Sequence, residues 1–289
     1  MEESPRVFVP AHITAFFDPH YDSDPLKTGS RGAGFSITLG SKVKIYLRRS
    51  REQDIEVFIN GKRSKAITTL TAIRNMIGKE HYKVRVEIEQ DLPTSQGFGM
   101  SGAGALGASL ALSKLMGLDR LTAIKNAHLA DVMCGTGLGD VISQAFGGIE
   151  IRRSPGLPPW GLIEHIPGDF EVVVCIVGRE IDTRKVLGDE RVRRRISKYG
   201  KYCLSSLIDN PSVERLFDLS REFMRSTDLA SKEVERAVDA VSIFGKASMC
   251  MIGNSVFAIG DPDRLMEVLS NFGKVYRARV DPEGARFLD

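Results

Sequence analysis

A glycine-rich segment in the middle of the chain constrains its fold more than any other feature. Residues 93–105 read PTSQGFGMSGAGA and lie between a strand-like run, residues 84–89, and a run of small residues and leucines that predicts a helix to about Leu115. A helix N-terminus after a glycine turn presents unpaired N–H groups and the positive end of the helix dipole, and it binds phosphate well. The segment therefore indicates a protein that handles a nucleotide. The alternative is a glycine turn before a buried helix of small residues.

Other phosphate-binding patterns fit this segment poorly. Gly97-x-Gly99-x-x-Gly102 matches the dinucleotide fingerprint, but that turn directly follows a strand, and an acidic residue ends a second strand about 20 residues later. Here Asp91 and Pro93 precede the turn, and residues 121–133 predict a helix instead of a strand. No Gly-Lys pair is followed by Ser or Thr, which excludes a P-loop. The His-Arg-Asp and Asp-Phe-Gly motifs of protein kinases are also missing.

The first half of the chain predicts an α+β domain. The expected strands cover residues 6–9, 34–38, 42–47 and 55–59, with a hairpin turn at Asn60-Gly61 and a helix over residues 67–77. Few β-α-β alternations occur, which argues against a doubly wound sheet. A Pro-rich stretch, residues 154–161, predicts a boundary between two domains, residues 1–155 and 156–289.

The second half predicts a ferredoxin-like domain. Its expected elements are a strand over 171–177, helices over 191–207, 213–225 and 232–244, strands over 248–252 and 256–259 joined by a two-residue hairpin at Gly253-Asn254, a helix over 262–271 and a strand over 275–280. With the extra helices set aside, the order is β-α-β-β-α-β.

The glycine-rich segment resembles the phosphate-binding motif of the GHMP kinases, commonly Pro-x-x-x-Gly-Leu-Gly-Ser-Ser-Ala. Phe98 stands for the usual Leu and Met100 for the first Ser. The resemblance implies a two-domain fold, with an N-terminal α+β domain of the ribosomal-protein-like left-handed βαβ type and a ferredoxin-like C-terminal domain. It also implies ATP and Mg²⁺ as cofactors, with Ser101 reaching the metal or the phosphates. The implied nucleotide-binding residues are Pro93, Gly97, Phe98, Gly99, Met100, Ser101, Gly102 and Ala103.

Two carboxylates downstream are further candidates. Residues 136–148 contain Thr-Gly-Leu-Gly-Asp and later Gly-Gly, which resembles the Ser-Gly-x-Asp segment of the same family. The resemblance implies that Asp140 is the catalytic residue that takes the proton of the acceptor hydroxyl; the alternative is a helix N-cap. Asp131, on the preceding helix, is the implied metal ligand, although relatives more often carry Glu. The alternative for Asp131 is a solvated helix face.

Residues 28–34, TGSRGAG, indicate the acceptor. Together with the Asp140 segment and the Met-x-Gly-Asn strand, they resemble the pantoate kinases, an archaeal branch of the family that makes 4-phosphopantoate on the route to coenzyme A. Pantoate carries a carboxylate, which an Arg fork binds well. We expect Arg31, Ser30 and His12 to contact the substrate; the alternatives are an exposed arginine and a structural histidine. Further cations that can face the cleft are Arg153, Arg184 and Lys185, whereas residues 193–195 predict a solvated helix surface.

One departure keeps other functions open. The third family motif, Gly-Ala-Gly, is missing from residues 247–254. The alternatives are therefore another small-alcohol kinase, of the mevalonate, homoserine or shikimate type, and a nucleotide-binding protein without kinase activity.

Composition limits the partners and the compartment. A net charge of +3 is too small to indicate nucleic acid binding, and no apolar run approaches the roughly 18 residues of a membrane span. The N-terminus lacks the apolar core of a signal peptide. Four scattered cysteines form no zinc or disulfide pattern. We expect a cytoplasmic protein, and the resemblance is compatible with a homodimer.

Overall fold

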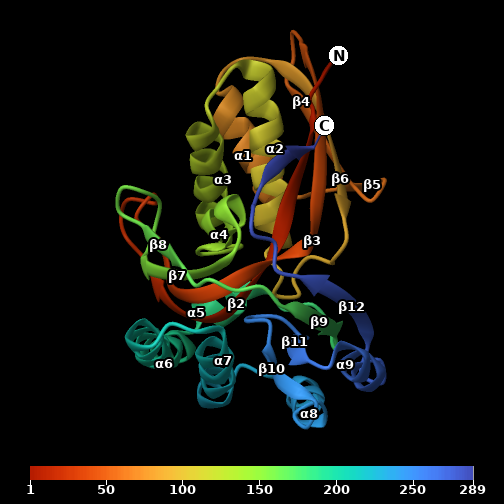
Figure 1. Ribbon diagram of the computed structural model, residues 1–289. Coiled ribbons are helices and arrows are strands. Elements are labelled where there is room, and N and C mark those ends of the chain that lie inside the picture. Colours follow the sequence, from red (N-terminus) through yellow and green to blue (C-terminus); the bar gives the residue numbers. More distant parts are fainter. Residues whose placement is uncertain (289) are drawn as a thin grey trace.

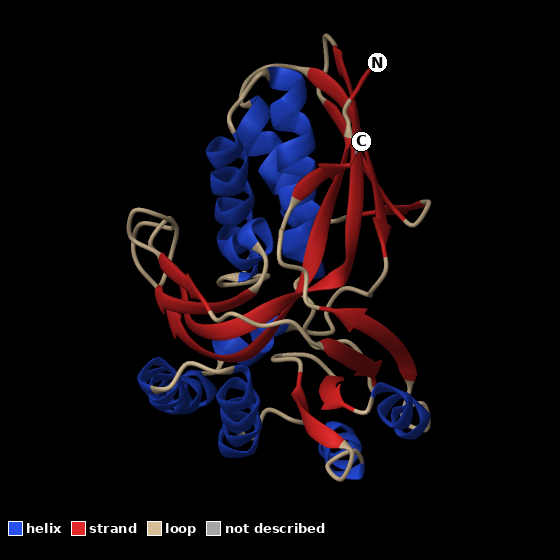
Figure 2. Ribbon diagram, in the orientation of Figure 1, coloured by secondary structure: helices blue, strands red, loops and turns tan. Residues whose placement is uncertain are grey.

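The computed structural model describes residues 1–288, which form two β-sheets with helices packed on them (Figures 1 and 2). In the larger sheet the main strand order is β13-β2-β3-β6-β4-β5, β1 pairs with β3, and β7 lies between β3 and β8. The strands of this sheet are β1 (Glu2–Glu3), β2 (Arg6–His20), β3 (Gly29–Arg49), β4 (Asp54–Ile59), β5 (Lys62–Ser64), β6 (Tyr82–Gln90), β7 (Ile149–Ser154), β8 (Leu162–His165) and β13 (Arg286–Leu288).

The two longest strands correct the sequence prediction. Residues 34–38 and 42–47 were expected as separate strands, but both belong to β3, and β2 continues eleven residues beyond Val9. The pairing of β2 with β3 continues past Pro10 and Gly40 because irregularities after Pro10 and Thr14 absorb the changes of register. This long ribbon curves from the larger sheet across the centre of the molecule (Figure 1).

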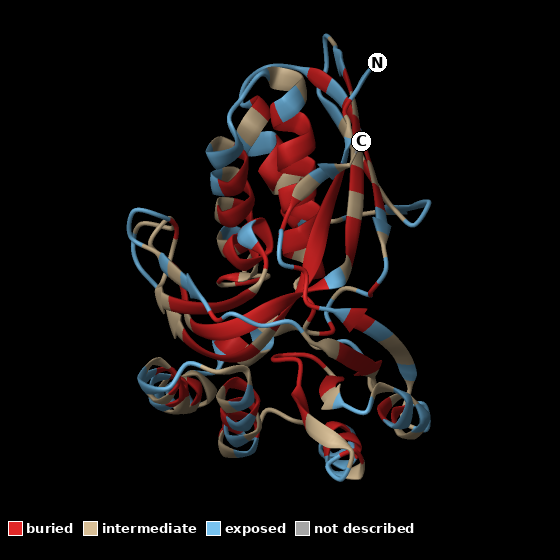
Figure 3. Cartoon of the chain, viewed as in Figure 1, coloured by how far each residue is buried: buried red, intermediate tan, exposed pale blue. Residues whose placement is uncertain are grey.

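Four helices pack on one side of the larger sheet: α1 (Ile67–Ile77), α2 (Met100–Met116), α3 (Arg120–Cys134) and α4 (Asp140–Phe146). Parallel strands β4 and β6 flank α1 along the chain. Helix α2 is buried over most of its length (Figure 3). Its small residues allow close packing: a Cβ on Gly107 would lie 2.5 Å from Val43 Cγ2. The small residues therefore allow α2, the helix that follows the glycine-rich segment, to pack closely against β3.

The smaller sheet is antiparallel with the strand order β10-β11-β9-β12. This order, with a helical connection before β10 and another before β12, confirms the ferredoxin-like prediction. The elements are β9 (Glu171–Ile176), α5 (Thr183–Gly188), α6 (Glu190–Asp209), α7 (Val213–Thr227), α8 (Lys232–Ala240), β10 (Gly245–Met249), β11 (Ser255–Gly260), α9 (Pro262–Leu269) and β12 (Lys274–Arg279). The α8 helix ends at Ala240 instead of Phe244.

The predicted hairpin at Gly253-Asn254 is wrong. Strand β10 ends at Met249 and β11 begins at Ser255, so five residues connect them. Within this connection Ile252 has φ 58°, in the left-handed region that β-branched residues rarely adopt. The longer loop packs against the glycine-rich segment, because a Cβ on Gly97 would lie 2.6 Å from the Cys250 carbonyl oxygen. The tertiary contact overrides the local turn signal.

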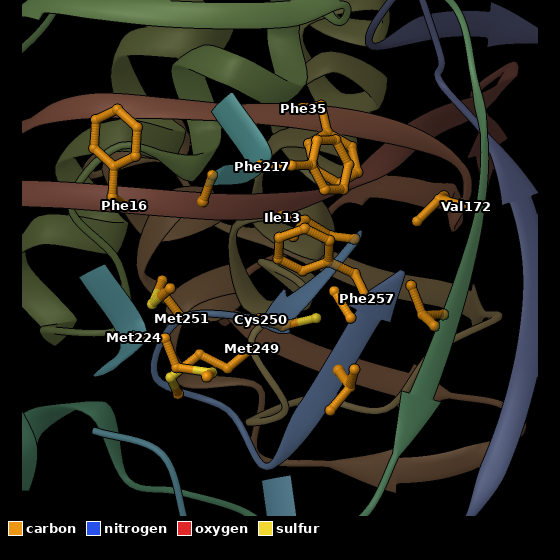
Figure 4. Close-up of a cluster of buried hydrophobic side chains, with 14 of the residues drawn as sticks. Ile13, Phe16, Phe35, Val172, Phe217, Met224, Met249, Cys250, Met251 and Phe257 are labelled. Carbon is orange, nitrogen blue, oxygen red and sulfur yellow. The ribbon is translucent and has the colours of Figure 1, made fainter. Parts of the chain in front are cut away.

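One hydrophobic core joins the ribbon to the smaller sheet (Figure 4). Phe35 of β3 stacks on Phe217 of α7, with ring centroids 5.9 Å apart. Phe257 of β11 contacts both rings edge-on, and its centroid lies 5.4 Å from each of theirs. Strand β8 and strand β13, from the second half of the chain, pair within the larger sheet. The predicted division into residues 1–155 and 156–289 stays a prediction.

Candidate active site

The glycine-rich segment forms the turn between β6 and α2. Gly97 and Gly99 have φ of 80° and 63°, so the turn uses the conformation that glycine permits. The first bond of the helix runs from Ala103 N to Gly99 O, at 2.9 Å. The N–H groups of Met100, Ser101 and Gly102 precede that bond and have no acceptor within the helix. The segment thus has the backbone geometry of an anion-binding site.

These helix residues line a cavity of about 440 Å³, a size usual for small-molecule sites. Ile67 of α1, Thr136 before α4, Arg184 of α5 and Ile252 also line it. The predicted site residues that line the cavity are Gly97, Gly99, Met100, Ser101, Gly102, Asp140 and Ser30. The structure therefore places seven predicted site residues, from three separate segments, around one cavity.

Three predicted nucleotide-binding residues lie outside the cavity wall. Pro93 is exposed in the turn, and Ala103 is buried inside α2. Phe98 is 1% exposed and belongs to the hydrophobic core. Its carbonyl oxygen accepts a hydrogen bond from the backbone N–H of His12, at 3.1 Å. Phe98, which replaces the Leu usual in the family motif, therefore packs in the core beneath the turn.

Asp140 is the first residue of α4 and reaches the cavity beside the glycine turn. Its side chain is 23% exposed, and Oδ1 accepts a hydrogen bond from His12 Nδ1 at 2.7 Å. The N-cap alternative is wrong, because Gly139 occupies the cap position and no side chain caps the helix. Gln144 Nε2 also donates to the Gly99 carbonyl oxygen, at 2.9 Å. The two motifs, about 40 residues apart in the chain, are thus in direct contact.

Asp131 is buried near the end of α3, which excludes the solvated-face alternative. It accepts a hydrogen bond from Thr136 Oγ1 at 2.6 Å. A Cβ on Gly137 would overlap Asp131 Oδ2 and lie 2.9 Å from Asp140 Oδ2, so both carboxylates face this glycine. Burial and the Asp140 charge raise the pKa of Asp131 to about 7. Two neighbouring carboxylates suit a divalent cation. Within residues 1–288, however, no group of three or more His, Cys, Asp or Glu residues is arranged as a metal cluster.

His12 lies behind Asp140, out of the cavity. Its side chain is completely buried on β2, and Nε2 lies 2.8 Å from Glu150 Oε1. Burial lowers the pKa of His12, but Glu150 and Asp140 outweigh that effect and raise it to about 9. Burial likewise opposes ionisation of Glu150, but His12 and Arg152 lower its pKa below the ordinary value. His12 therefore does not line the cavity, and its expected contact with the substrate stays a prediction.

Ser30 and Arg31 were both expected to contact the substrate, but only Ser30 lies at the cavity. Ser30 lines the cavity. Arg31 turns to the buried carboxylate of Asp18, with Nη2 at 2.5 Å and Nε at 3.2 Å. Asp18 also accepts from Ser197 of α6 at 2.6 Å, and His20 Nε2 lies 2.8 Å away. Arg31 thus pairs with Asp18 across the ribbon and does not line the cavity, whereas Asp18 also contacts α6.

Sequence analysis missed Arg152. The neighbouring residue Arg153, named as a candidate, pairs with Glu164 near the surface at 2.7 Å. Arg152, on the opposite side of β7, is 2% exposed and pairs with Glu150. Its Nε has no partner among residues 1–288, and a Cβ on Gly139 would lie 3.2 Å from it and 3.0 Å from Ser30 Oγ. The strand alternation that separates Arg152 from Arg153 was present in the sequence.

Similar proteins carry the same fold. The family pattern of the GHMP kinases N terminal domain matches residues 64–148. The pantoate kinase of Thermococcus kodakarensis is 38% identical over 94% of this chain and 93% of its own length. The pantoate kinase of Methanocaldococcus jannaschii is 33% identical over 91% of this chain and 96% of its own. The chain belongs to the GHMP kinase family, and it is therefore an enzyme of the phosphotransferase class with a hydroxyl acceptor.

A solved structure extends this likeness to the whole chain. A "Phosphotransferase related to CoA biosynthesis pathway" superposes with a TM-score of 0.89 at 34% identity, covering 97% of both chains. Together with the two archaeal relatives, it makes the pantoate kinases the branch of the family that this chain resembles. Among residues 1–288, no helix combines the length and the apolar character that crossing a bilayer requires.

Proposed function

We propose that this protein transfers the γ-phosphoryl group of ATP to the terminal hydroxyl of pantoate, forming 4-phosphopantoate and ADP. One observation carries the proposal: the first turn of α2 and the carboxylate of Asp140 line the same cavity. Phosphoryl transfer depends mainly on positioning and on stabilising charge. A phosphate-binding helix end beside a carboxylate meets both needs. The likeness to two pantoate kinases supports the choice of acceptor.

The α2 end of the cavity would bind the triphosphate. The free N–H groups of Met100, Ser101 and Gly102 point their partial positive charge toward it. Ser101 and Asp131 would hold Mg²⁺, which binds one or two carboxylates together with waters and substrate phosphates. When bound, the ion neutralises phosphate charge.

Asp140 would act on the acceptor hydroxyl. Its Oδ1 is occupied by His12, which leaves Oδ2 to accept the proton of the acceptor hydroxyl. The hydroxyl oxygen then forms a bond to the γ-phosphorus as the bond from that phosphorus to the β–γ bridging oxygen breaks. ADP leaves with that oxygen, and the proton remains on Asp140 until water removes it.

Acceptor binding requires a cation and an apolar surface, because pantoate has a carboxylate and two methyl groups. Ser30 lines the cavity beside Gly139 and would bind the carboxylate, together with Nε of Arg152, which has no partner among the described residues and lies behind that glycine. Phe17, Leu138 and Leu187 line the cavity and would contact the methyl groups. Arg184, also in the wall, is the other cation within reach. This assignment replaces Arg31, which is engaged by Asp18.

An acceptor panel tests the proposal. ADP release is measured with ATP, Mg²⁺ and pantoate, and in parallel with mevalonate, homoserine and shikimate; an Asp140→Asn variant serves as the matched control. Turnover confined to pantoate and lost in the variant supports the proposal. Turnover with another acceptor instead assigns a sister kinase. Saturable ATP binding without turnover of any acceptor assigns a nucleotide-binding protein.

The remaining expectations belong to the same proposal. We infer that the protein works in the cytoplasm, where thiols stay reduced, because all four cysteines are free. A homodimer is proposed from the family resemblance alone. Light scattering of the purified chain tests it, and a monomeric mass contradicts it.

A further inference from the structure

A chain of four buried or half-buried charged side chains begins at Asp140 and leads away from the cavity. Asp140 contacts His12, His12 contacts Glu150, and Glu150 pairs with Arg152. The signs alternate, and His12, Glu150 and Arg152 are each no more than 2% exposed. Ser143 Oγ also donates to Glu150 Oε1, at 3.1 Å. Such a group of charges persists inside a protein only if each member is paired.

The geometry defines the charge on His12. Its two ring nitrogens lie 2.7 Å and 2.8 Å from carboxylate oxygens of Asp140 and Glu150. An ionised carboxylate only accepts hydrogen bonds, and a neutral imidazole donates from one nitrogen only. Both contacts are satisfied together when both nitrogens carry protons. The imidazolium then makes two charge-assisted hydrogen bonds.

The backbone of His12 also contacts the glycine-rich segment. Its N–H donates to the Phe98 carbonyl oxygen within the glycine-rich segment, at 3.1 Å. Strand β3 leaves room for the ring, because a Cβ on Gly34 would lie 2.7 Å from His12 Nε2 and 3.0 Å from Glu150 Oε1. One residue thus connects the phosphate-binding turn, through its backbone, to Asp140, through its side chain.

We propose, on the basis of the proposed kinase function, that His12 is a positioning residue for phosphoryl transfer. Its imidazolium holds Oδ1 of Asp140, with Oδ2 free for the acceptor hydroxyl. Glu150, fixed by Arg152, holds the imidazolium from behind. His12 keeps its own two protons throughout the reaction, so it neither touches the substrate nor transfers a proton.

Three variants separate this role from a purely structural one. His12→Gln removes the charge and leaves one carboxylate without a donor, whereas His12→Lys keeps a cation. Ser220→Ala is the matched control, because Ser220 Oγ makes a buried hydrogen bond to the same strand, to Ala15 O at 2.8 Å, without contacting Asp140. Steady-state kinetics with ATP and pantoate, each varied, are measured from pH 5 to 9 on all variants that fold by circular dichroism.

For His12→Gln we expect kcat to fall by roughly 10- to 100-fold while the KM for ATP stays within about 2-fold. The groups facing His12 are Asp140 from α4 and Glu150 and Arg152 from β7, with Asp131 of α3 beyond Asp140. His12→Lys should recover most of the lost kcat, and Ser220→Ala should leave kcat and both KM values unchanged. A folded His12→Gln protein with wild-type kcat would overturn the proposal.

The charge on His12 can also be measured by spectroscopy on the wild-type protein, which requires neither turnover nor a variant. The wild-type chain is labelled with ¹⁵N-histidine, and the ring nitrogens of His12 are observed at pH 7. Matching imidazolium shifts on both nitrogens support the proposal, and the split shifts of a neutral ring overturn it. If no acceptor is phosphorylated, the proposed function fails, but this spectrum still decides the charge on His12.

Discussion

His12 makes the stability of this protein depend on pH in a defined window. The pKa of the ring rises from 6.5 in the unfolded chain to about 9 in the folded one. Between these values the folded state holds a proton that the unfolded state releases, so stability is fully present below pH 6.5 and is lost as pH rises through 9. The difference between these two pKa values corresponds to roughly 3 kcal/mol of stability.

Urea unfolding at a series of pH values from 6 to 10 measures this loss. The free energy of unfolding of the wild-type protein should fall by roughly 3 kcal/mol more than that of His12→Gln between pH 6.5 and 9. Subtracting the free energy of unfolding of His12→Gln from that of the wild type removes the contributions of groups that titrate alike in both proteins. Burial raises the pKa of Cys175 and Cys203 to about 12, which lowers stability above pH 9 in both proteins. Asp131, with a pKa of about 7, lowers stability between about pH 4 and 7 in both.

One result would refute this reasoning, and a second would move the comparison to another variant. Parallel pH dependence of the two proteins across pH 6.5 to 9 would mean that the His12 ring is not charged in the fold. A different urea m-value for His12→Gln would mean that the variant changes the extent of unfolding, and the comparison then moves to Glu150→Gln, which removes one of the two carboxylates. That variant should lose part of the same pH dependence.

Further substitutions address the other parts of the site. Asp140→Asn should lower kcat by about 10²- to 10⁴-fold with little change in ATP affinity by calorimetry; near-full activity would exclude a base at this position. Asp131→Asn should raise the Mg²⁺ concentration for half-maximal activity by about 10-fold, and an unchanged Mg²⁺ titration would contradict its role as a ligand. Arg152→Lys keeps the charge but loses the fork, so the KM for pantoate should rise by about 10-fold while that for ATP does not; equal effects on both would argue for a structural role. Gly200→Ala places a Cβ against the Phe17 carbonyl oxygen and should cost about 1–3 kcal/mol of stability in thermal unfolding, whereas an unchanged Tm would show that α6 can shift.

The parts of this fold that local sequence specifies were predictable. The glycine turn and the helix after it, the helix over residues 121–133 and the ferredoxin-like order follow from signals within a few residues of each other. The Gly253-Asn254 turn and the break between residues 38 and 42 failed because packing against Gly97 and long-range strand pairing outweigh local turn chemistry.

The partners of charged side chains were not predictable from local sequence. His12 and Asp140 are 128 residues apart, and their contact depends on how β2 lies beside α4. Arg31 was expected at the substrate because glycines flank it, but Asp18 opposes it directly across the β2–β3 ribbon. Tertiary packing of a strand against a helix decides the first contact and strand register decides the second, and local sequence signals specify neither.

Strand β13 supports the reaction centre from a distant part of the sequence. β13 pairs with β2, and the segment before it reaches α4: Ala285 N donates to Gln144 O at 2.8 Å, and Arg120 donates to Ala285 O at 2.8 Å. The helix that begins with Asp140 is therefore supported by a segment far from it in the sequence. Order at the reaction centre is thus coupled to the pairing of β13 with β2, although no residue of β13 lines the cavity.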